Sequence, residues 1–365
     1  MRLNKLIGST LALAVASALA LSGCGDEGKK TIRISHTQIE THPDHIGLQA
    51  FEKYVEDKLG EKYDVVIFPN STLGANEKVL ELVKQGSVQY LVVSTANIES
   101  FDKLYSLFSI PYLFTSEQAY ESFITSEDFI QKLGVNSEKN GFTPEAAFTA
   151  GSRNFYAKTP IHTVADLHGK KFRVQAGPTN VKMMTKFGAA ATPMSFGEVY
   201  SALQQSVIDG AENNELALTD QKHGEVTKYY SYDMHQMCPD MLVVSNKFFA
   251  SLTPEDKQVF EEAAKEAQKA EFDAWHTRIE EAKKQATDMG VQFINVDVNE
   301  FRNAVISLHQ ELLQATPELK DLYDAAEEAN AKAPPPPAPT PQPEPASEEG
   351  TEGGAPAAEG EQQAS

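Results

Sequence analysis

Two arginines near the middle of the chain could bind a carboxylate. Arg153 follows Gly151-Ser152, and Arg173 lies in the apolar run Lys171-Phe-Arg-Val-Gln175. A guanidinium offers a rigid fork of donors that matches the two oxygens of a carboxylate, and it stays charged at any physiological pH. The alternative for either arginine is an ion pair at the protein surface, which contributes little to stability.

The usual sequence signatures of catalysis are missing. The chain has no Gly-x-Ser-x-Gly elbow, Walker A loop, Gly-x-Gly-x-x-Gly fingerprint, Cys-x-x-Cys pair or His-Glu-x-x-His helix. Pairs of catalytic carboxylates leave little trace in a sequence, so a secreted enzyme stays open as an alternative. We nevertheless predict that the chain is not an enzyme and uses no cofactor.

Three histidines near the N-terminus are close enough in sequence to suggest a metal site. His36, His42 and His45 match no common zinc spacing, however, and no thiolate supports them. We therefore predict no metal site and interpret these histidines as ligand-contacting or surface residues. Cys238, beside Pro239, is interpreted as a buried thiol.

The N-terminal segment has the pattern of an export signal. Arg2 and Lys5 precede a short apolar run at residues 11–21, which ends in Leu21-Ser22-Gly23-Cys24. This ending resembles the lipobox of bacterial lipoproteins, which implies cleavage after residue 23 and lipid attachment to Cys24. An ordinary signal peptide that happens to contain a cysteine is the alternative. We predict a periplasmic or cell-surface protein that is anchored to the membrane through this lipid.

The C-terminal segment, residues 331–365, is rich in Pro, Ala, Glu and Gly and has no aromatic residue. Such a composition cannot bury enough surface to offset the entropy of ordering, so we predict a disordered acidic tail. The whole chain has 52 acidic and 32 basic residues, a formal net charge of -20. This balance argues against nucleic-acid binding. It does not exclude an anionic ligand, because salt screens charges beyond about 8 Å.

Between these ends, β-rich runs alternate with amphipathic stretches, which predicts an α/β protein with largely parallel sheets. The predicted strands are residues 31–35, 64–68, 88–93, 171–175, 191–194 and 241–245, and the predicted helices are 46–59, 77–85, 179–187 and 197–205. The elements form two series, which indicates two lobes.

A long helical pattern begins after Thr253, a hydroxyl residue suited to an N-cap, with Pro254 at the first helical position. Its apolar stripe continues until Gly290. About 35 residues of helix would extend roughly 50 Å, enough to lie along both lobes. Two shorter helices with a break between them remain the alternative.

Six short segments have a distinctive order along the chain. They are Phe68-Pro-Asn-Ser-Thr-Leu-Gly74, Ile110-Pro-Tyr-Leu-Phe114, Gly151-Ser-Arg153, Asp166-Leu-His-Gly-Lys-Lys-Phe-Arg-Val174, Glu198-Val-Tyr-Ser-Ala-Leu-Gln204 and Asp209-Gly-Ala-Glu-Asn213. Together they closely resemble the DctP-type substrate-binding proteins of TRAP transporters (tripartite ATP-independent periplasmic transporters). The resemblance covers nearly all of residues 31–325.

The resemblance implies a two-lobe periplasmic solute-binding fold with crossing connections, a long helix that spans both lobes, and a cleft that closes on its ligand. We expect residues 24–30 to form a linker after the anchor. Lobe I is expected to comprise residues 31–150 and about 239–278, and lobe II residues 151–238 and about 279–330. The implied partners are a small carboxylate and the TRAP membrane subunits, with the binding protein itself a monomer.

The same resemblance implies roles for individual residues. Arg173 corresponds to the main carboxylate clamp of the family, Arg153 to a second guanidinium, and Asn213 to an amide that donates to the same group. If Arg173 is this clamp, its side chain should face a wet, open cleft in the ligand-free protein.

The chain departs from the common family pattern after Asn213, where Asn214 replaces the usual proline. With His235 and Asp240 downstream, this form resembles the branch that binds sugar acids such as uronates and aldonates. A carboxylate at Asp240 would suit the hydroxyl donors of a polyol.

His36, Gln38 and Glu77 are expected at the cleft edge of the first lobe, with a scaffold role as the alternative. The other hypotheses for the chain are a C4-dicarboxylate or keto-acid binding protein of the same class and a sensor that presents its ligand to a receptor.

Overall fold

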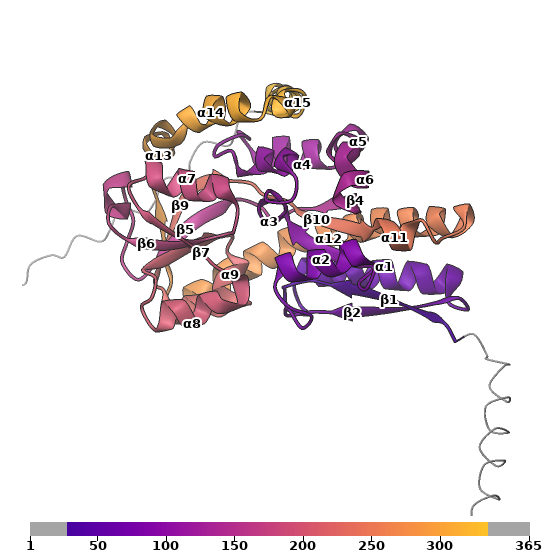
Figure 1. The fold of residues 1–365 in the computed structure, drawn as a ribbon. Helices are drawn as coiled ribbons and strands as arrows, with labels where there is room; N and C mark the ends of the chain where they lie inside the picture. The colour runs from indigo at the N-terminus through magenta and orange to yellow at the C-terminus, as the bar shows by residue number, and fades with distance from the viewer. Residues whose placement is uncertain (1–27, 335–365) are drawn as a thin grey trace, which may run out of the picture. The chain divides into compact units, whose positions relative to one another are not determined.

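Two mixed β-sheets organise residues 28–334, the part of the chain that the computed structural model describes (Figure 1). The predicted signal peptide, Cys24 with its predicted lipid and nearly all of the predicted tail lie outside the described residues. In the described part, no helix combines the length and the apolar character that crossing a membrane requires.

The first sheet has the order β2-β1-β3-β10-β4. Its strands are β1 (Lys30–Ser35), β2 (Tyr63–Phe68), β3 (Tyr90–Ser94), β4 (Phe142–Phe148) and β10 (Asp240–Ser245). Strand β1 pairs in parallel with β2 and β3, whereas β10 is antiparallel to both β3 and β4. A strand from late in the sequence is therefore an inner strand of the first sheet.

The second sheet has the order β11-β9-β5-β8-β6-β7. Its strands are β5 (Arg153–Ala157), β6 (Lys171–Val174), β7 (Ala190–Pro193), β8 (Gly210–Asn213), β9 (Tyr229–Gln236) and β11 (Gln292–Asn295). Strand β5 is antiparallel to β8 and β9, and the other pairs are parallel.

The sheets are more mixed than predicted: five of their nine strand pairs are parallel, and each of the four antiparallel pairs contains β5 or β10. The chain passes from the first sheet to the second between β4 and β5 and returns between β9 and β10, in each case through a short segment without a helix. The two passages run in opposite directions, so the strands that flank them pair antiparallel. A parallel pair would need a longer crossover, usually through a helix. These two passages are the crossing connections that the sequence predicts.

The helices cover the faces and edges of the sheets. They are α1 (Pro43–Leu59), α2 (Asn76–Gln85), α3 (Thr95–Ile98), α4 (Glu117–Ile124), α5 (Glu127–Leu133), α6 (Ser137–Asn140), α7 (Pro178–Lys186), α8 (Val199–Gln204), α9 (Leu216–Thr219), α10 (His223–Val226), α11 (Asn246–Phe249), α12 (Pro254–Asp288), α13 (Val298–Val305), α14 (Ser307–Ala315) and α15 (Lys320–Lys332). Short 3-10 helices lie at Lys103–Ser109, Gly134–Asn136, Val164–Leu167, Phe196–Glu198 and Pro317–Leu319.

Helix α12 is continuous over 35 residues, so the alternative of two shorter helices is excluded. The hydroxyl of Thr253 accepts a hydrogen bond from the amide of Asp256 at 3.1 Å, as the predicted N-cap requires. The helix packs against α1 and β4 at one end and against α9 further along (Figure 1). It therefore contacts elements of both sheets.

Helix α1 begins at Pro43, three residues before the predicted start. Nδ1 of His42 accepts a hydrogen bond from the backbone amide of Asp44 at 3.2 Å and caps the helix. Pro43 has no backbone N–H group, and the first helical position requires none. Ile46 is one of the exposed large hydrophobic residues. The buried face carries Leu48, Phe51 and Val55 instead.

The C-terminal helices connect the two halves of the described chain. Helix α13 packs on α7 and β9, whereas α15 packs on α4. The amide of Asn330 donates to the carbonyl of Leu113 at 2.8 Å. The segment from α13 to α15 thus begins beside the second sheet and ends beside α4, which precedes β4 in the chain. The predicted lobe boundaries remain a prediction.

Gly210 opens β8 at a point where the backbone is tightly enclosed. A Cβ atom there would lie 2.6 Å from the carbonyl oxygen of Tyr156. We expect Gly210→Ala to lower the free energy of unfolding by about 1–3 kcal/mol, the usual effect of overpacking. Chemical denaturation measures it, with Gly197→Ala as the control because no atom lies within 4 Å of its Cβ position. Equal stability of the two variants would contradict this prediction.

Candidate ligand-binding site

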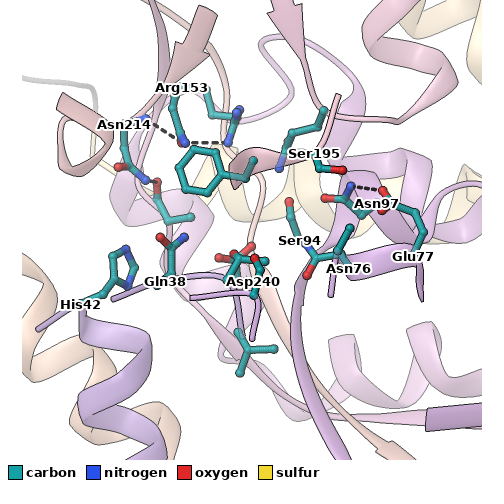
Figure 2. A pocket seen from close by; sticks show the side chains of 18 of the residues that line it. Gln38, His42, Asn76, Glu77, Ser94, Asn97, Arg153, Ser195, Asn214 and Asp240 are labelled. Carbon is teal, nitrogen blue, oxygen red and sulfur yellow. Dashed lines mark hydrogen bonds between the residues drawn. The ribbon is translucent and has the colours of Figure 1, made fainter. Parts of the chain in front are cut away.

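A pocket lies between elements of the two sheets (Figure 2). From the first sheet and its helices it is lined by Thr37, Gln38, His42, Ser71, Ala75, Asn76, Glu77, Val92, Ser94, Asn97 and Asp240. From the second sheet and its flanking segments it is lined by Ala150, Arg153, Arg173, Gln175, Ser195, Phe196, Asn213 and Asn214. Several of these residues end or follow strands β1, β3, β6 and β8, the usual position of ligand sites in α/β sheets.

Arg173 is a buried cation in β6. Its Nε and Nη2 donate to the carbonyl of Met194 at 3.1 and 3.0 Å, and its guanidinium lies 5.6 Å from the ring centre of Phe196. Within residues 28–334, no acidic side chain forms an ion pair with it. Burial, which leaves 3% of the residue exposed, lowers the pKa of the guanidinium. The expectation that Arg173 faces a wet, open cleft is therefore wrong for this structure.

Arg153, at the start of β5, is neutralised within the protein. Its Nε donates to Oε2 of Glu212 at 2.5 Å, its Nη2 to the carbonyl of Glu212 at 2.8 Å, and its Nη1 to Oδ1 of Asn213 at 3.0 Å. Burial alone would lower the pKa of Arg153, but the Glu212 carboxylate raises it. The two arginines thus differ: Glu212 forms an ion pair with Arg153, whereas within the described residues Glu212 and Glu77 attract Arg173 only from a longer distance.

Glu212 also contacts a buried histidine behind the pocket. His235 Nδ1 lies 2.8 Å from Oδ2 of Asp233, and its Nε2 lies 3.5 Å from Oε2 of Glu212. Burial by itself would lower the pKa of His235, but the Asp233 and Glu212 carboxylates raise it to about 9. His235 is fully buried, and its ring stacks on Phe155. It lies behind Arg153 and does not line the pocket.

Asn213 and Asn214 have different roles. Oδ1 of Asn213 accepts from Arg153 and from the amide of Asn214 at 2.9 Å, while its Nδ2 has no partner in the described part of the chain. Asn214 uses both ends of its amide, donating to the carbonyl of Ala150 and accepting from the amide of Leu216, each at 3.1 Å. Asn213 therefore keeps a free donor at the pocket, whereas Asn214 fixes the local backbone.

The opposite wall is rich in acceptors. Glu77 accepts the amide of Asn97 at 2.7 Å through Oε1, as the dashed line in Figure 2 shows. Gln38 and Asp240 line the pocket as well, and Figure 2 labels both. Glu77 and Asp240 make this wall acidic, in contrast to Arg173, and burial and the nearby Asp44 raise the pKa of Asp240 to about 7.

The sequence interpretation missed three buried acceptors of the pocket. Oδ1 of Asn76, Oγ of Ser94 and Oε1 of Gln175 have no hydrogen-bond partner among the described residues. Ser94 ends β3, Gln175 follows β6 and Asn76 opens α2. Polar residues at the carboxyl ends of predicted strands were the signal that could have identified Ser94 and Gln175.

Six of the eight predicted ligand residues line the pocket: Arg173, Arg153, Asn213, Asp240, Glu77 and Gln38. The structure does not bring His36 or His235 to it. His36 is 1% exposed, and its Nε2 lies 3.0 Å from Nδ1 of His45. The third histidine of that cluster, His42, does line the pocket. Residues 28–334 contain no cluster of three His, Cys, Asp or Glu residues that could hold a metal.

Comparison with known proteins decides the family. Residues 34–316 match the sequence model of the bacterial extracellular solute-binding protein family 7, DctP. The chain belongs to this family. It is a transport family and not an enzyme family, and its members include the solute-binding proteins of TRAP transporters.

Relatives with known structure have the same fold. The chain is 43% identical to a TRAP periplasmic solute-binding protein from Anaerococcus prevotii with bound D-glucuronate, with a TM-score of 0.83 over 84% of this chain and all of that one. It is 31% identical to a protein of the same class from Sulfitobacter sp. NAS-14.1 with bound β-D-galacturonate, with a TM-score of 0.78 over 82% of this chain and all of that one.

A relative with a different ligand is nearly as similar in sequence. The C4-dicarboxylate-binding periplasmic protein DctP of Vibrio cholerae is 34% identical over 75% of this chain and 82% of its own length. Family membership therefore establishes a two-lobe solute-binding protein, and the ligand has to be inferred from the pocket.

Proposed function

We propose that this DctP-family chain captures a sugar acid, such as a uronate or an aldonate, and delivers it to the membrane subunits of a TRAP transporter. One observation carries the proposal: Arg173 is a buried cation that forms no ion pair with an acidic side chain of residues 28–334, and it lines the same pocket as Glu77 and Asp240. Removing a cation from water is costly unless an anion compensates it. A ligand carboxylate supplies that anion.

The charge distribution favours a ligand with a single carboxylate. Arg153 is already paired with Glu212, so Arg173 is the guanidinium at the pocket that remains uncompensated among residues 28–334. A second carboxylate, as in a C4-dicarboxylate, would extend toward Glu77 and Asp240. Like charges at short range in a poorly solvated pocket repel strongly. The C4-dicarboxylate hypothesis is therefore the weaker one.

The uncharged end of the ligand has to supply hydroxyl donors. Among the described residues, the buried acceptors of the pocket without a partner are the oxygens of Asn76, Ser94 and Gln175. The carboxyl groups of Glu77 and Asp240 offer further oxygens, although Oε1 of Glu77 already accepts from Asn97. A buried acceptor without a donor costs free energy, and a hydroxylated ligand removes that cost. Keto acids such as pyruvate lack these donors. The relatives with bound glucuronate and galacturonate support a sugar acid.

The other parts of the proposal rest on the sequence and on the family. The lipobox-like end of the signal segment supports anchoring to the membrane through Cys24. The absence of catalytic motifs supports a binding protein that returns its ligand unchanged, and we propose that it acts as a monomer. Deletion of the gene should abolish uptake of the ligand. A loss of signalling with uptake intact would favour the sensor hypothesis instead.

Binding to a panel of acids tests the proposal. We expect D-glucuronate, D-galacturonate or D-gluconate to raise the melting temperature of the protein by several degrees, as a ligand far above its Kd does. D-glucose is the matched control, because it has the hydroxyls of glucuronate without the carboxylate. Chromatography of the recovered ligand checks that it is unchanged.

Two outcomes would contradict the proposal. A shift with succinate that exceeds every sugar acid would replace the ligand class and keep the binding role. A shift with glucose equal to that with glucuronate would show that Arg173 does not bind a ligand carboxylate.

A further inference from the structure

Behind the pocket, four buried side chains of alternating charge contact one another in a row. Arg153 comes from β5, Glu212 from β8, and Asp233 and His235 from β9, three strands that are neighbours in the second sheet. Arg153 is 3% exposed, and the other three residues are fully buried. Charges are tolerated away from water only where partners of opposite sign compensate them. The four groups therefore depend on one another.

His235 lies between two carboxylates. Its Nδ1 is 2.8 Å from Oδ2 of Asp233, and its Nε2 is 3.5 Å from Oε2 of Glu212. A neutral imidazole has a single N–H group, whereas an imidazolium has one at each nitrogen and so suits both carboxylates. Burial disfavours the charged form, but the two carboxylates raise the pKa of His235 to about 9. His235 thus carries a positive charge at neutral pH.

Glu212 makes both of its ionic contacts through one oxygen. Oε2 accepts from Nε of Arg153 at 2.5 Å and is also the oxygen nearer His235, while Oε1 is buried and has no hydrogen-bond partner among the described residues. An arginine and a carboxylate by themselves favour two parallel hydrogen bonds, one to each oxygen. The pair departs from that geometry, and the attraction between His235 and Oε2 accounts for the departure.

This geometry leaves donors of Arg153 for other acceptors. Nη1 donates to Oδ1 of Asn213 at 3.0 Å, and Nη2 donates to the carbonyl of Glu212 at 2.8 Å. Oδ1 of Asn213 also accepts a hydrogen bond from the backbone amide of Asn214 at 2.9 Å. Because two donors face this atom, it has to be the amide oxygen. The NH2 group of Asn213 therefore remains available to the pocket that Asn213 lines.

We propose that His235, which does not line the pocket, is a positioning residue that sets the ligand affinity through Asn213. It attracts Glu212, so that Arg153 binds this carboxylate through Nε alone and keeps Nη1 for Asn213. The amide of Asn213 is thereby held with its NH2 group toward the ligand. The inference rests on the proposed function in one respect, that a bound acid accepts a hydrogen bond from Asn213.

The physical reason is competition for one carboxylate. Without His235, the carboxylate of Glu212 can rotate and bind Arg153 through both oxygens. The second bond requires Nη1 or Nη2, and these two donors now hold Asn213 and the carbonyl of Glu212. Either exchange moves the guanidinium relative to Asn213. The amide then loses one of the two donors that fix its orientation, and a ligand has to restore that orientation when it binds.

Isothermal titration calorimetry of the full chain tests the inference with D-glucuronate as the probe, or with the acid of the panel that binds most tightly. We expect His235→Gln to raise the Kd by about fivefold to twentyfold. In the Asn213→Ala background the same substitution should change the Kd by less than about twofold, because the group through which His235 acts is gone. An unchanged Kd in His235→Gln would overturn the inference. So would losses of equal size in the two backgrounds, since a residue that acts only on the fold gives no such coupling.

Asp256→Asn is the matched control for lost stability. Asp256 is also a buried charge, in an ion pair with Lys62 and a hydrogen bond with Tyr63, and it does not line the pocket. It should lower the melting temperature and leave the Kd unchanged. A loss of affinity as large as that of His235→Gln would show that destabilisation alone weakens binding, and it would overturn the inference.

A second variant covers the case in which His235→Gln does not fold. Asp233→Asn keeps the shape of the side chain and removes the charge that holds the imidazolium. Its Kd should rise as well, by a smaller factor, and the rise should again vanish in the Asn213→Ala background. A Kd equal to that of the wild type would contradict the proposal.

The crystal structure of ligand-free His235→Gln, or of Asp233→Asn in its place, provides a readout that needs no ligand. The contact between Nη1 of Arg153 and Oδ1 of Asn213 should open beyond hydrogen-bonding distance, and an unchanged contact would overturn the inference. If no acid of the panel binds, the proposed function fails, and this contact alone decides whether His235 positions Asn213.

Discussion

Replacing Arg173 by alanine should weaken sugar-acid binding by a factor of at least about 30, while the ligand-free protein keeps its melting temperature. Truncating one partner of a buried, hydrogen-bonded charge pair costs about 2–5 kcal/mol, and the ligand carboxylate is the partner that Arg173 would lose. The ligand-free protein loses little, because within residues 28–334 the guanidinium bonds to a carbonyl and to no carboxylate. Calorimetry and thermal unfolding of the same preparation measure both effects.

Two further variants sharpen this prediction. Arg173→Lys keeps the charge but loses the forked donor, so its affinity should lie between those of the wild type and Arg173→Ala. Arg278→Ala is the control, because Arg278 forms a partly buried ion pair with Asp220 and does not line the pocket. It should lower the melting temperature and leave the Kd unchanged. The reverse result for Arg173→Ala, a destabilised protein with normal affinity, would assign Arg173 to the scaffold.

Replacing His235 by glutamine should lower the free energy of unfolding at low pH, because the charged imidazole stabilises the fold there. In the wild-type protein this contribution is lost as the pH rises. The folded pKa of His235, about 9, lies above the value of about 6.5 that the unfolded chain would have. A histidine with a raised pKa stabilises the fold fully below pH 6.5, and this stabilisation is lost as the pH rises through 9. The shift corresponds to roughly 3 kcal/mol, or several degrees in melting temperature.

Melting temperatures between pH 6 and pH 10 test this prediction. The difference between wild type and His235→Gln should be largest at pH 6 and small at pH 10. His162→Gln, at an exposed position, should follow the wild type throughout. A constant difference between wild type and His235→Gln over this range would mean that His235 stabilises the fold by packing on Phe155 and not by its charge.

Local patterns in the sequence predicted six of the eleven strands and five of the fifteen α-helices of residues 28–334. Thr253 and Pro254 indicated the start of helix α12, and its apolar stripe indicated its length, because capping and helical periodicity depend on residues a few positions apart. The sequence did not predict the direction in which the strands pair. That direction depends on where the chain passes from one sheet to the other, just before β5 and just before β10. These two strands pair with strands far away in the sequence.

The sequence alone also predicted six of the residues that line the pocket. The order of the motifs along the chain identified three of them, Arg153, Arg173 and Asn213. Only the tertiary structure decided which of these groups are free to act. Glu212, 59 positions away, neutralises Arg153, while Arg173 has no such partner among the described residues. The net charge that a ligand meets depends on contacts between distant segments, and the spacing of residues along the chain does not encode those contacts.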